Sequence, residues 1–193
     1  MKPLDAGADW TAIEADRTTL PELQSFYEAN PEYWLIVYGH PPRPDDAEQD
    51  FDARPPADMP YRALCSWLIR EPATQRVIGE VSVVIDLLAA GVIHLGFFIV
   101  DAARRGTGLA AEIHRSYELW AIEQGARWLR LGVVAGNRRA HAFWLRNGYA
   151  EVRRRENYLI GERAHSLIVM VKPLGSNTVA DYLALVPRDR PAS

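Results

Sequence analysis

The sequence has a single cysteine, Cys65, among its 193 residues. One thiol cannot close an internal disulfide, so packing alone must hold the fold, and a reducing, cytoplasmic compartment is predicted. The sequence also lacks an excess of positive charge, because the formal net charge is −3 and the pI is about 6.0. This balance argues against nucleic acid as a partner.

Long apolar runs are absent except over residues 81–100. This stretch is as long as a membrane span, but it contains Asp86 and His94 and is interrupted by Ala89-Ala90-Gly91. It is also rich in β-branched residues, which favours two strands joined by a short turn. The first ten residues, MKPLDAGADW, have no apolar core of the signal-peptide kind. No membrane partner is therefore predicted.

Hydrophobic residues make up 48% of the chain and charged residues 24%, which is typical of a globular domain. The spacing of apolar residues and the turn signals predict an α+β order with one strand–helix–strand crossover. In the first half, the predicted elements are a strand at 10–15, helices at 21–29 and 31–39, a proline-rich acidic surface segment at 40–60 with one or two helical turns, and strands at 61–70, 77–87 and 92–100. In the second half they are a helix from 109 to about 124, a strand at 128–134 and a helix from 137 to about 147. A hairpin of 149–160 and 163–171, which turns at Gly161, and a weak helix at 178–185 complete the order.

The stretch ARRGTGLAAE, residues 103–112, suits a phosphate group because small residues let the backbone approach an anion at the start of a helix. A P-loop requires Lys followed by Ser or Thr after its last glycine, whereas Leu109 and Ala110 follow Gly108. The stretch also fits G-x-G-x-x-A, but a dinucleotide fingerprint belongs in a series of βαβ units with an acidic residue after the next strand. The preceding strands form hairpins here, and the next strand ends in GVVAGN, so this class is disfavoured.

The third class of phosphate loop fits better. Arg105, Gly108 and Ala110 satisfy R/Q-x-x-G-x-G/A, the pyrophosphate loop of the GNAT (general N-acetyltransferase) superfamily, which this chain resembles. A second block, LRLGVVAGNRRAHAFWLRNGYAEV over 129–152, resembles the later part of the same superfamily almost throughout. The resemblance is specific over residues 77–172.

The resemblance implies a GNAT-like mixed, mostly antiparallel sheet with flanking helices, in which a splayed strand pair forms an acyl-CoA cleft. It implies one domain over residues 1–174, with the helical and loop region 16–60 building the acceptor side. Residues 175–193 are then a C-terminal tail. The apolar residues 178–186 of this tail suit a partner surface, so a homodimer is an open prediction.

The resemblance also implies acetyl-CoA as the acyl donor, lying between the 92–100 and 128–134 strands. The implied cofactor contacts are Phe98, Ile99, Val100, Arg104, Arg105, Gly106, Thr107, Gly108, Leu109, Ala110, Asn137, Ala140, Phe143 and Trp144. Asn137 also suits a helix N-cap, and both roles stay open. His141 and His165 have no metal-ligand partners at suitable spacing, so no metal is predicted.

The implied reaction is direct attack by a primary amine, of a small molecule or a peptide, on acetyl-CoA in a ternary complex. A backbone N–H near Phe98 or Ile99 would polarise the thioester carbonyl. His94 lies where some members carry a catalytic glutamate, and strand alternation would place it on one face with Gly96 and Phe98. A neutral imidazole is a reasonable base near neutral pH. Glu80 and Asp86 remain rival bases.

The chain departs from the family pattern at Trp144, where many members carry a tyrosine that acts as the general acid. An indole N–H cannot deliver a proton, so the thiolate must leave unaided or another group must protonate it. This departure keeps an alternative function open, a non-catalytic module that binds or senses acyl-CoA.

Overall fold

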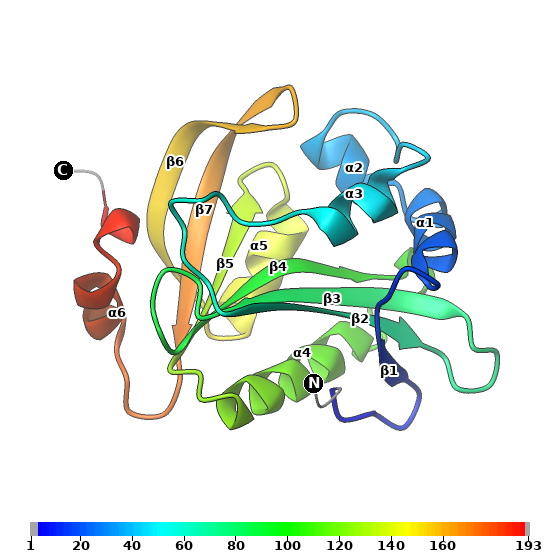
Figure 1. Ribbon diagram of the computed structural model, residues 1–193, viewed down its shortest axis with the longest axis horizontal. Helices are drawn as coiled ribbons and strands as arrows, with labels where there is room; N and C mark the ends of the chain where they lie inside the picture. Colours follow the sequence, from blue (N-terminus) through cyan, green and yellow to red (C-terminus); the bar gives the residue numbers. More distant parts are fainter. Residues whose placement is uncertain (1–3, 192–193) are drawn as a thin grey trace.

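The computed structural model describes residues 4–191 and is built on one mixed, mostly antiparallel sheet (Figure 1). Its seven strands lie in the order β1-β2-β3-β4-β5-β7-β6. The strands are β1 (Thr11–Glu14), β2 (Ala63–Arg70), β3 (Val77–Ile85), β4 (Val92–Val100), β5 (Trp128–Val134), β6 (Ala150–Ile160) and β7 (Arg163–Pro173). The predicted fold class is confirmed, and the strand boundaries differ by a few residues.

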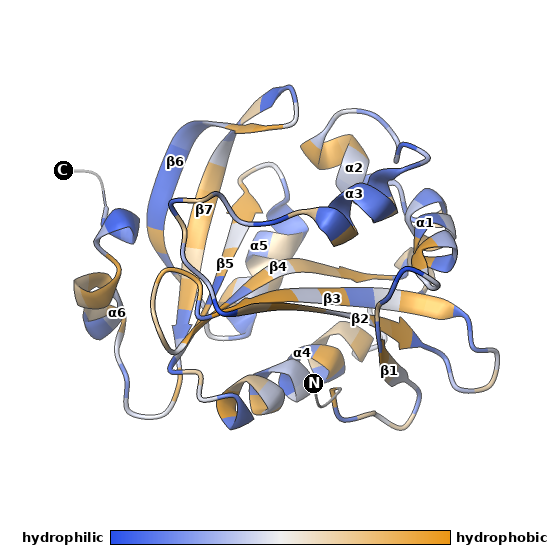
Figure 2. Cartoon of the chain, viewed as in Figure 1, coloured by the Kyte–Doolittle hydropathy of each residue, from blue (hydrophilic) through white to orange (hydrophobic). Residues whose placement is uncertain are grey.

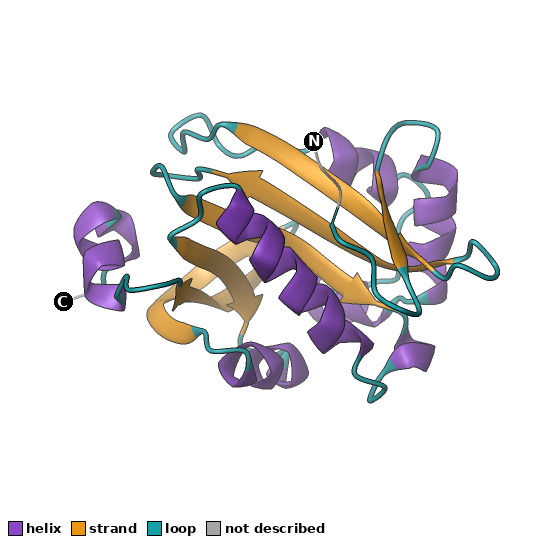
Figure 3. Cartoon of the chain, turned by 90° about the horizontal axis from the view of Figure 1, so that it is seen from below, coloured by secondary structure: helices purple, strands orange, loops and turns teal. Residues whose placement is uncertain are grey.

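Helices cover both faces of the sheet (Figures 1 and 3). They are α1 (Leu20–Ala29), α2 (Glu32–Val37), α3 (Asp46–Asp52), α4 (Leu109–Glu123), α5 (Arg138–Arg146) and α6 (Val179–Leu185), with short 3₁₀ turns at Ala102–Arg104 and Pro187–Asp189. The largest core cluster joins the sheet to α4 and α5 on what we call the α4 face. Two smaller clusters pack α1–α3 and α6 on the opposite face, called the α2 face.

Hydropathy follows this layering (Figure 2). The inner strands are largely apolar because both of their faces are covered, whereas β6 at the sheet edge and α3 are mainly hydrophilic. The apolar stretch 81–100 forms the end of β3, a turn and β4. Within residues 4–191, no helix has the length and apolar character needed to cross a membrane.

β4 and β5 form a parallel pair that separates partway along. Their pairing runs from Val92 opposite Trp128 to Leu95 opposite Leu131, and both strands then continue without each other. Gly96 and Gly132 are the first residues beyond the last pair, and both are exposed. The predicted splayed strand pair is confirmed, and we call this opening the fork.

A β-bulge in β4 changes the face on which its side chains lie. Phe97 pairs with Ser82 on β3, but Leu95 pairs with Val83, so Gly96 is an extra residue. Leu95 packs in the α4-face core, as does Phe98, although the two residues are three positions apart. The expectation that His94 shares a face with Phe98 is therefore wrong, because the bulge reverses the alternation between them.

The C-terminal segment is packed against the sheet. Thr178 and Asp181 form a capping box at the start of α6. Tyr182 and Val186 are buried against Trp128 and other residues of the α2 face. The predicted helix at 178–185 is confirmed, and its apolar residues cover the chain's own sheet.

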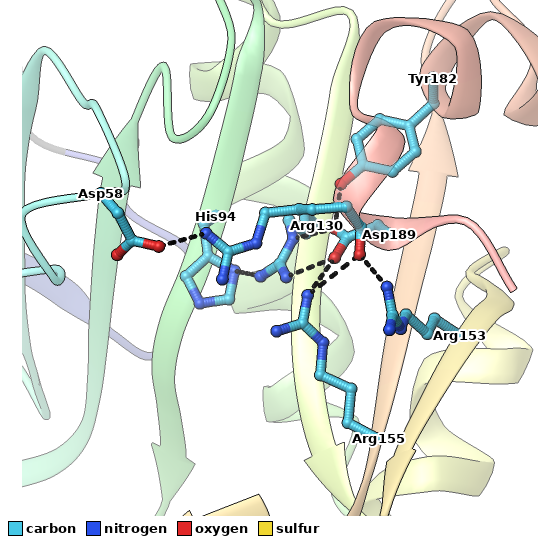
Figure 4. A network of polar contacts seen from close by, with 8 residues as sticks. Asp58, His94, Arg130, Arg153, Arg155, Tyr182 and Asp189 are labelled. Atoms are coloured by element: carbon cyan, nitrogen blue, oxygen red, sulfur yellow. Dashed lines mark hydrogen bonds and ion pairs between the residues drawn. The ribbon is translucent and has the colours of Figure 1, made fainter. Parts of the chain in front are cut away.

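A buried ion-pair network fastens this segment to β5 and β6 (Figure 4). Asp189 is fully buried and accepts hydrogen bonds from Arg130 Nε at 2.7 Å, Arg155 Nη2 at 2.7 Å and the Tyr182 hydroxyl at 2.6 Å. Burial alone would raise the pKa of Asp189, but the hydrogen bonds and charge of Arg130 lower it to about 2. These partners thus offset the cost of burying the Asp189 carboxylate.

We expect Asp189→Ala to lower the free energy of unfolding by about 3–5 kcal/mol, because it leaves the Arg130 charge buried without its partner. Urea unfolding at pH 7 measures the loss. In the wild type, the stabilisation by Asp189 should be lost as the pH falls from about 4 to about 2. Asp58→Ala is the control, since the Asp58 side chain is 72% exposed in its pair with Arg188. An equal loss in both variants would contradict the prediction.

Candidate functional site

The fork opens into a cleft of about 620 Å³ that is bordered by both faces of the sheet. On one side it reaches the loop before α4 and the start of α5. On the other side it reaches α2 and the β6–β7 hairpin. Gly96 and Gly132 line the passage between these two halves. Neither glycine has a side chain to close the passage, so the cleft joins two compartments at the fork.

The loop before α4 presents unpaired backbone donors to the cleft. Gly106 and Gly108 have φ values of +77° and +93°, a conformation that favours glycine. Within the described chain, the N–H groups of Gly106, Gly108 and Ala110 have no hydrogen-bond acceptor. They lie at the start of α4, where the helix dipole adds positive potential. This arrangement suits the oxygens of a phosphate group.

Arginines surround this loop and are paired with carboxylates of neighbouring elements. Arg104 forms an ion pair with Glu71. Arg105 and Arg139 both pair with Glu32 of α2. The Glu32 carboxylate thus lies between two guanidinium groups on the cleft wall, and a phosphate there would compete for the same donors.

Two predicted contacts of the loop, the exposed Thr107 and the buried Leu109, are not on the cleft wall. The Thr107 hydroxyl donates to the Arg104 carbonyl at 2.8 Å, which fixes the turn. Leu109 is buried in the core beneath α4. Their backbone, not their side chains, shapes the loop.

The first turns of α5 form the opposite wall of this half of the cleft. Asn137 caps α5, since its side chain accepts the Ala140 N–H at 3.1 Å, and it also lines the cleft. Phe143 and Trp144 line the cleft and pack against Phe98, with ring centroids 5.9 Å and 5.4 Å away. The predicted cap is confirmed, and the wall around it is apolar and aromatic.

The backbone of β4 beyond the fork turns one donor toward the cleft. Asp101 donates its N–H to the Ile78 carbonyl of β3 at 2.9 Å. The Ile99 carbonyl lies 2.8 Å from where Gly79 of β3 would carry a Cβ atom. Since backbone groups of successive residues point to opposite sides of a strand, Phe98 turns its N–H away from β3, into the fork. Of the two predicted donors, Phe98 has the suitable orientation.

His94 lies beside the fork on the α2 face and is not on the cleft wall. Its Nδ1 is 3.1 Å from Arg130 Nη1. Arginine can only donate, so Nδ1 accepts and the proton of the neutral ring is on Nε2. Burial, and then the charge of Arg130, lowers the pKa of His94 to about 3. This arrangement makes His94 a hydrogen-bond donor at neutral pH and does not support its predicted role as a base.

Glu80 lies on β3 opposite Ile99, on the α2 face of the sheet beneath α1. Its carboxyl group is buried and accepts hydrogen bonds from the Tyr27 hydroxyl at 2.6 Å and the Ser66 hydroxyl at 2.9 Å. Burial raises the pKa of Glu80 to about 7 despite these two bonds. Glu80 is therefore a group that can exchange a proton near neutral pH, although, like His94, it is not on the cleft wall.

The remaining titratable candidates do not converge on the fork. Asp86 lies in the turn after β3, where it accepts from Gly91 and Arg62. Tyr149 is buried against Trp144, and its hydroxyl is 3.2 Å from His114 Nε2. In residues 4–191, no group of His, Cys, Asp and Glu side chains is arranged so that it could hold a metal ion.

The sequence pointed to the region 16–60 for the second half of the cleft but not to the individual residues that line it. Its walls are formed by Tyr33 and Ile36 of α2, Phe97 of β4 and Leu167 of β7. Tyr33 packs edge-on against Phe97, with ring centroids 4.8 Å apart. These residues come from three distant segments and carry no motif, so only the fold brings them together.

Comparisons with known proteins give one family match and several solved structures with a similar fold. The family model described as "Acetyltransferase (GNAT) family" matches residues 23–149. An acetyltransferase from Thermus thermophilus has a similar structure, with TM-score 0.66 and 19% identity over 90% of this chain and 100% of that one. Spermidine N-acetyltransferase from Vibrio cholerae, in complex with CoA and spermine, gives TM-score 0.65 and 13% identity over 86% and 96% of the chains.

A third similar structure is the ribosomal-protein-S18-alanine N-acetyltransferase from Escherichia coli. It gives TM-score 0.61 and 15% identity over 88% of this chain and 97% of that one. At such low identity these structures share the fold alone with this chain. No curated protein sequence matches it significantly.

The buried Glu80 should make stability fall as the pH rises. Its side chain ionises near 4.5 when unfolded but near 7 when folded, so the folded state loses up to about 3 kcal/mol between these pH values. The glutamine of Glu80→Gln cannot ionise. The free energy of unfolding of this variant should therefore rise relative to that of the wild type between pH 5 and pH 8. Urea unfolding at both pH values tests this. Glu48→Gln, at an exposed carboxylate, should show no such gain, and a pH-independent difference for Glu80→Gln would refute the prediction.

Proposed function

The chain belongs to the GNAT acetyltransferase family, and on this premise we propose that it transfers an acetyl group from acetyl-CoA to a primary amine in a ternary complex. One observation carries the proposal: a single cleft joins a loop of unpaired N–H donors to a separate apolar groove through the fork. Two substrates entering from opposite sides would meet at Gly96 and Gly132. Direct transfer requires such a meeting point.

The proposed donor site uses residues of three segments. The N–H groups of Gly106, Gly108 and Ala110 would hold the pyrophosphate, and Arg105 would turn from Glu32 to a phosphate oxygen. The pantetheine arm would pass between β4 and β5 along Ile99 and Val100. Asn137, Ala140, Phe143 and Trp144 would form its other wall. The unpaired donors in this loop support the assignment, because a bound anion would satisfy them.

The proposed chemistry is aminolysis of the thioester. The Phe98 N–H would bind the carbonyl oxygen and stabilise the negative charge that develops on it. The amine nitrogen forms a bond to the acyl carbon, the carbon–sulfur bond breaks, and CoA leaves as the thiolate. A thiol with a pKa of about 8.5 is a tolerable leaving group without an acid, which is compatible with Trp144 at the position of the usual tyrosine.

We propose that Glu80, rather than His94, accepts the proton that the attacking amine loses. Nδ1 of His94 is already occupied by Arg130, whereas the pKa of Glu80 is raised to about 7. Glu80 lies on the α2 face beside Ile99, the same face as the apolar groove. Because Tyr27 covers the carboxyl group, a water molecule is the suitable carrier of the proton.

Acetyl-CoA and CoA should raise the unfolding temperature, and NAD should not. A ligand at about a hundred times its Kd stabilises by roughly 2.7 kcal/mol, which is easily detected. Amines are then tested for release of the CoA thiol. Binding of CoA with no turnover on any amine would favour the non-catalytic sensing module, with which the missing tyrosine is compatible. Absence of any shift with CoA would reject both functions.

Glu80→Gln should lower kcat/KM by about 10²–10⁴-fold, the usual contribution of a general base. It should also abolish the rise of kcat/KM with pH near 7, because the titrating carboxyl group is gone. Tyr27→Phe is the matched control, since it removes one hydrogen bond but keeps the carboxylate. Initial rates between pH 5.5 and 9 give the pH dependence of kcat/KM for each variant. If kcat/KM of Glu80→Gln still rises with pH near 7, Glu80 is excluded as the base.

A further inference from the structure

The acceptor half of the cleft adjoins the buried network around Asp189. Arg130 lies two residues before Gly132 on β5, on the same face of the sheet, and His94 pairs with it across the β4–β5 ladder. Two strand residues span about 7 Å. Gly132 lines the cleft without a side chain of its own, and the Leu167 side chain lies over it, 3.4 Å from where a Cβ atom would be. The network is therefore the neighbour of the fork on the acceptor side.

His94 directs a free donor toward the fork. Its Nδ1 accepts from Arg130, so Nε2 carries the proton, and no acceptor for it is found among the described residues. In Figure 4 this second ring nitrogen points along β4 toward the C-terminal end of the strand, where the fork opens. An acceptor oxygen near Gly96 would complete the hydrogen-bonding of the ring.

Arg155 adds unused donors on the opposite side. Its Nη2 binds Asp189, but its Nε is buried without an acceptor within the described chain, and so is Nε of Arg153. The Arg155 side chain is 19% exposed. Arg155 pairs across β6 and β7 with Leu167, a wall residue of the groove. Its guanidinium group thus has spare hydrogen-bonding capacity and lies beside a wall residue of the groove, although Arg155 itself is not on the cleft wall.

The network also has more positive than negative charge. Three arginines, Arg130, Arg153 and Arg155, contact the C-terminal segment, and within residues 4–191 Asp189 is the one carboxylate among their hydrogen-bond partners. A fourth, Arg188, is paired with Asp58 and adds no net charge. Arg130 is buried and paired with Asp189, whereas Arg153 and Arg155 are only partly buried, and partly buried charge in excess of its carboxylate partners is unfavourable. An anion at the edge of the groove would offset part of this cost.

We propose that the acceptor is an amino acid-like compound, a primary amine with a carboxylate close to the nitrogen, and that His94 Nε2 and Arg155 bind this carboxylate. The inference rests on the proposed function. The rest of the groove, formed by Tyr33, Ile36 and Leu167, is apolar or aromatic, so it suits an apolar side chain. The amine then lies at the fork, where the acyl carbon is presented.

Asp189 is a positioning residue in this arrangement. It fixes both Arg130 and Arg155, and through Arg130 it sets the tautomer of His94. The C-terminal segment thereby takes part in acceptor binding although it lies outside the donor half of the cleft.

The test uses amines that share a side chain and differ at the carboxylate, namely phenylalanine, phenylalanine amide and phenethylamine, with leucine and 3-methylbutylamine as a second series, and the rates are compared per neutral amine. Thiol release from acetyl-CoA gives kcat and KM for each. We expect kcat/KM to be at least tenfold higher for the free amino acids than for the amides and amines, because a charge-assisted hydrogen bond is lost in the latter.

Arg155→Met should raise KM for phenylalanine about 10- to 100-fold and leave KM for phenethylamine within about twofold. Arg154→Met is the matched control, because Arg154 is the next residue on β6, is exposed and pairs with Glu151. Both variants should keep the wild-type thermal shift with CoA. His94→Phe, which removes the second donor, should act like Arg155→Met on the amino acid series.

The outcomes separate the two proposals. If phenethylamine is acetylated as well as phenylalanine, or if Arg155→Met affects both substrates equally, the carboxylate site is wrong and the acetyltransferase proposal stands. If CoA binds but none of the amines is acetylated, the carboxylate site falls together with the proposed function.

Discussion

The loss of pairing between β4 and β5 after Leu95 and Leu131 is the feature on which the rest of the site depends. A continuous sheet would satisfy its own backbone groups and separate its two faces completely. At the fork, the Phe98 N–H is left without a strand partner, and the two faces become connected through Gly96 and Gly132. The loop of unpaired N–H donors and the apolar groove share one cleft only because of this opening.

Because of the bulge at Gly96, β4 places an aromatic side chain on the α4 face and a hydrogen-bonding side chain on the α2 face. Beyond it, Phe98 packs with Phe143 and Trp144 on the α4 face, so this wall of the cleft is aromatic. Before it, His94 is left on the α2 face beside Arg130. A regular strand would have placed His94 and Phe98 together. The extra residue thus separates the hydrogen-bonding group from the donor wall.

The sequence predicted the elements well because helices and strands have different apolar periods and because Gly125, Gly148 and Gly161 mark their ends. The phosphate loop was equally predictable, since its donors are close together in the chain. The bulge was not, because one extra residue in the apolar run VIHLGFFIV leaves no compositional signal. The tautomer of His94 was also hidden, since Arg130 fixes it from a strand that is 36 residues away.

The two faces of the sheet differ in how they carry buried charge. On the α2 face, Glu80 lies on the β3 side of the fork and Arg130 with Asp189 on the β5 side, and both sites bury polar groups that are expensive to desolvate. Around the donor arm, in contrast, the α4 face offers rings and backbone donors. A neutral thioester needs little more than shape and one hydrogen bond. An amine that carries both a proton to lose and a carboxylate to anchor needs groups of both signs, and these are found on the α2 face, on either side of the fork.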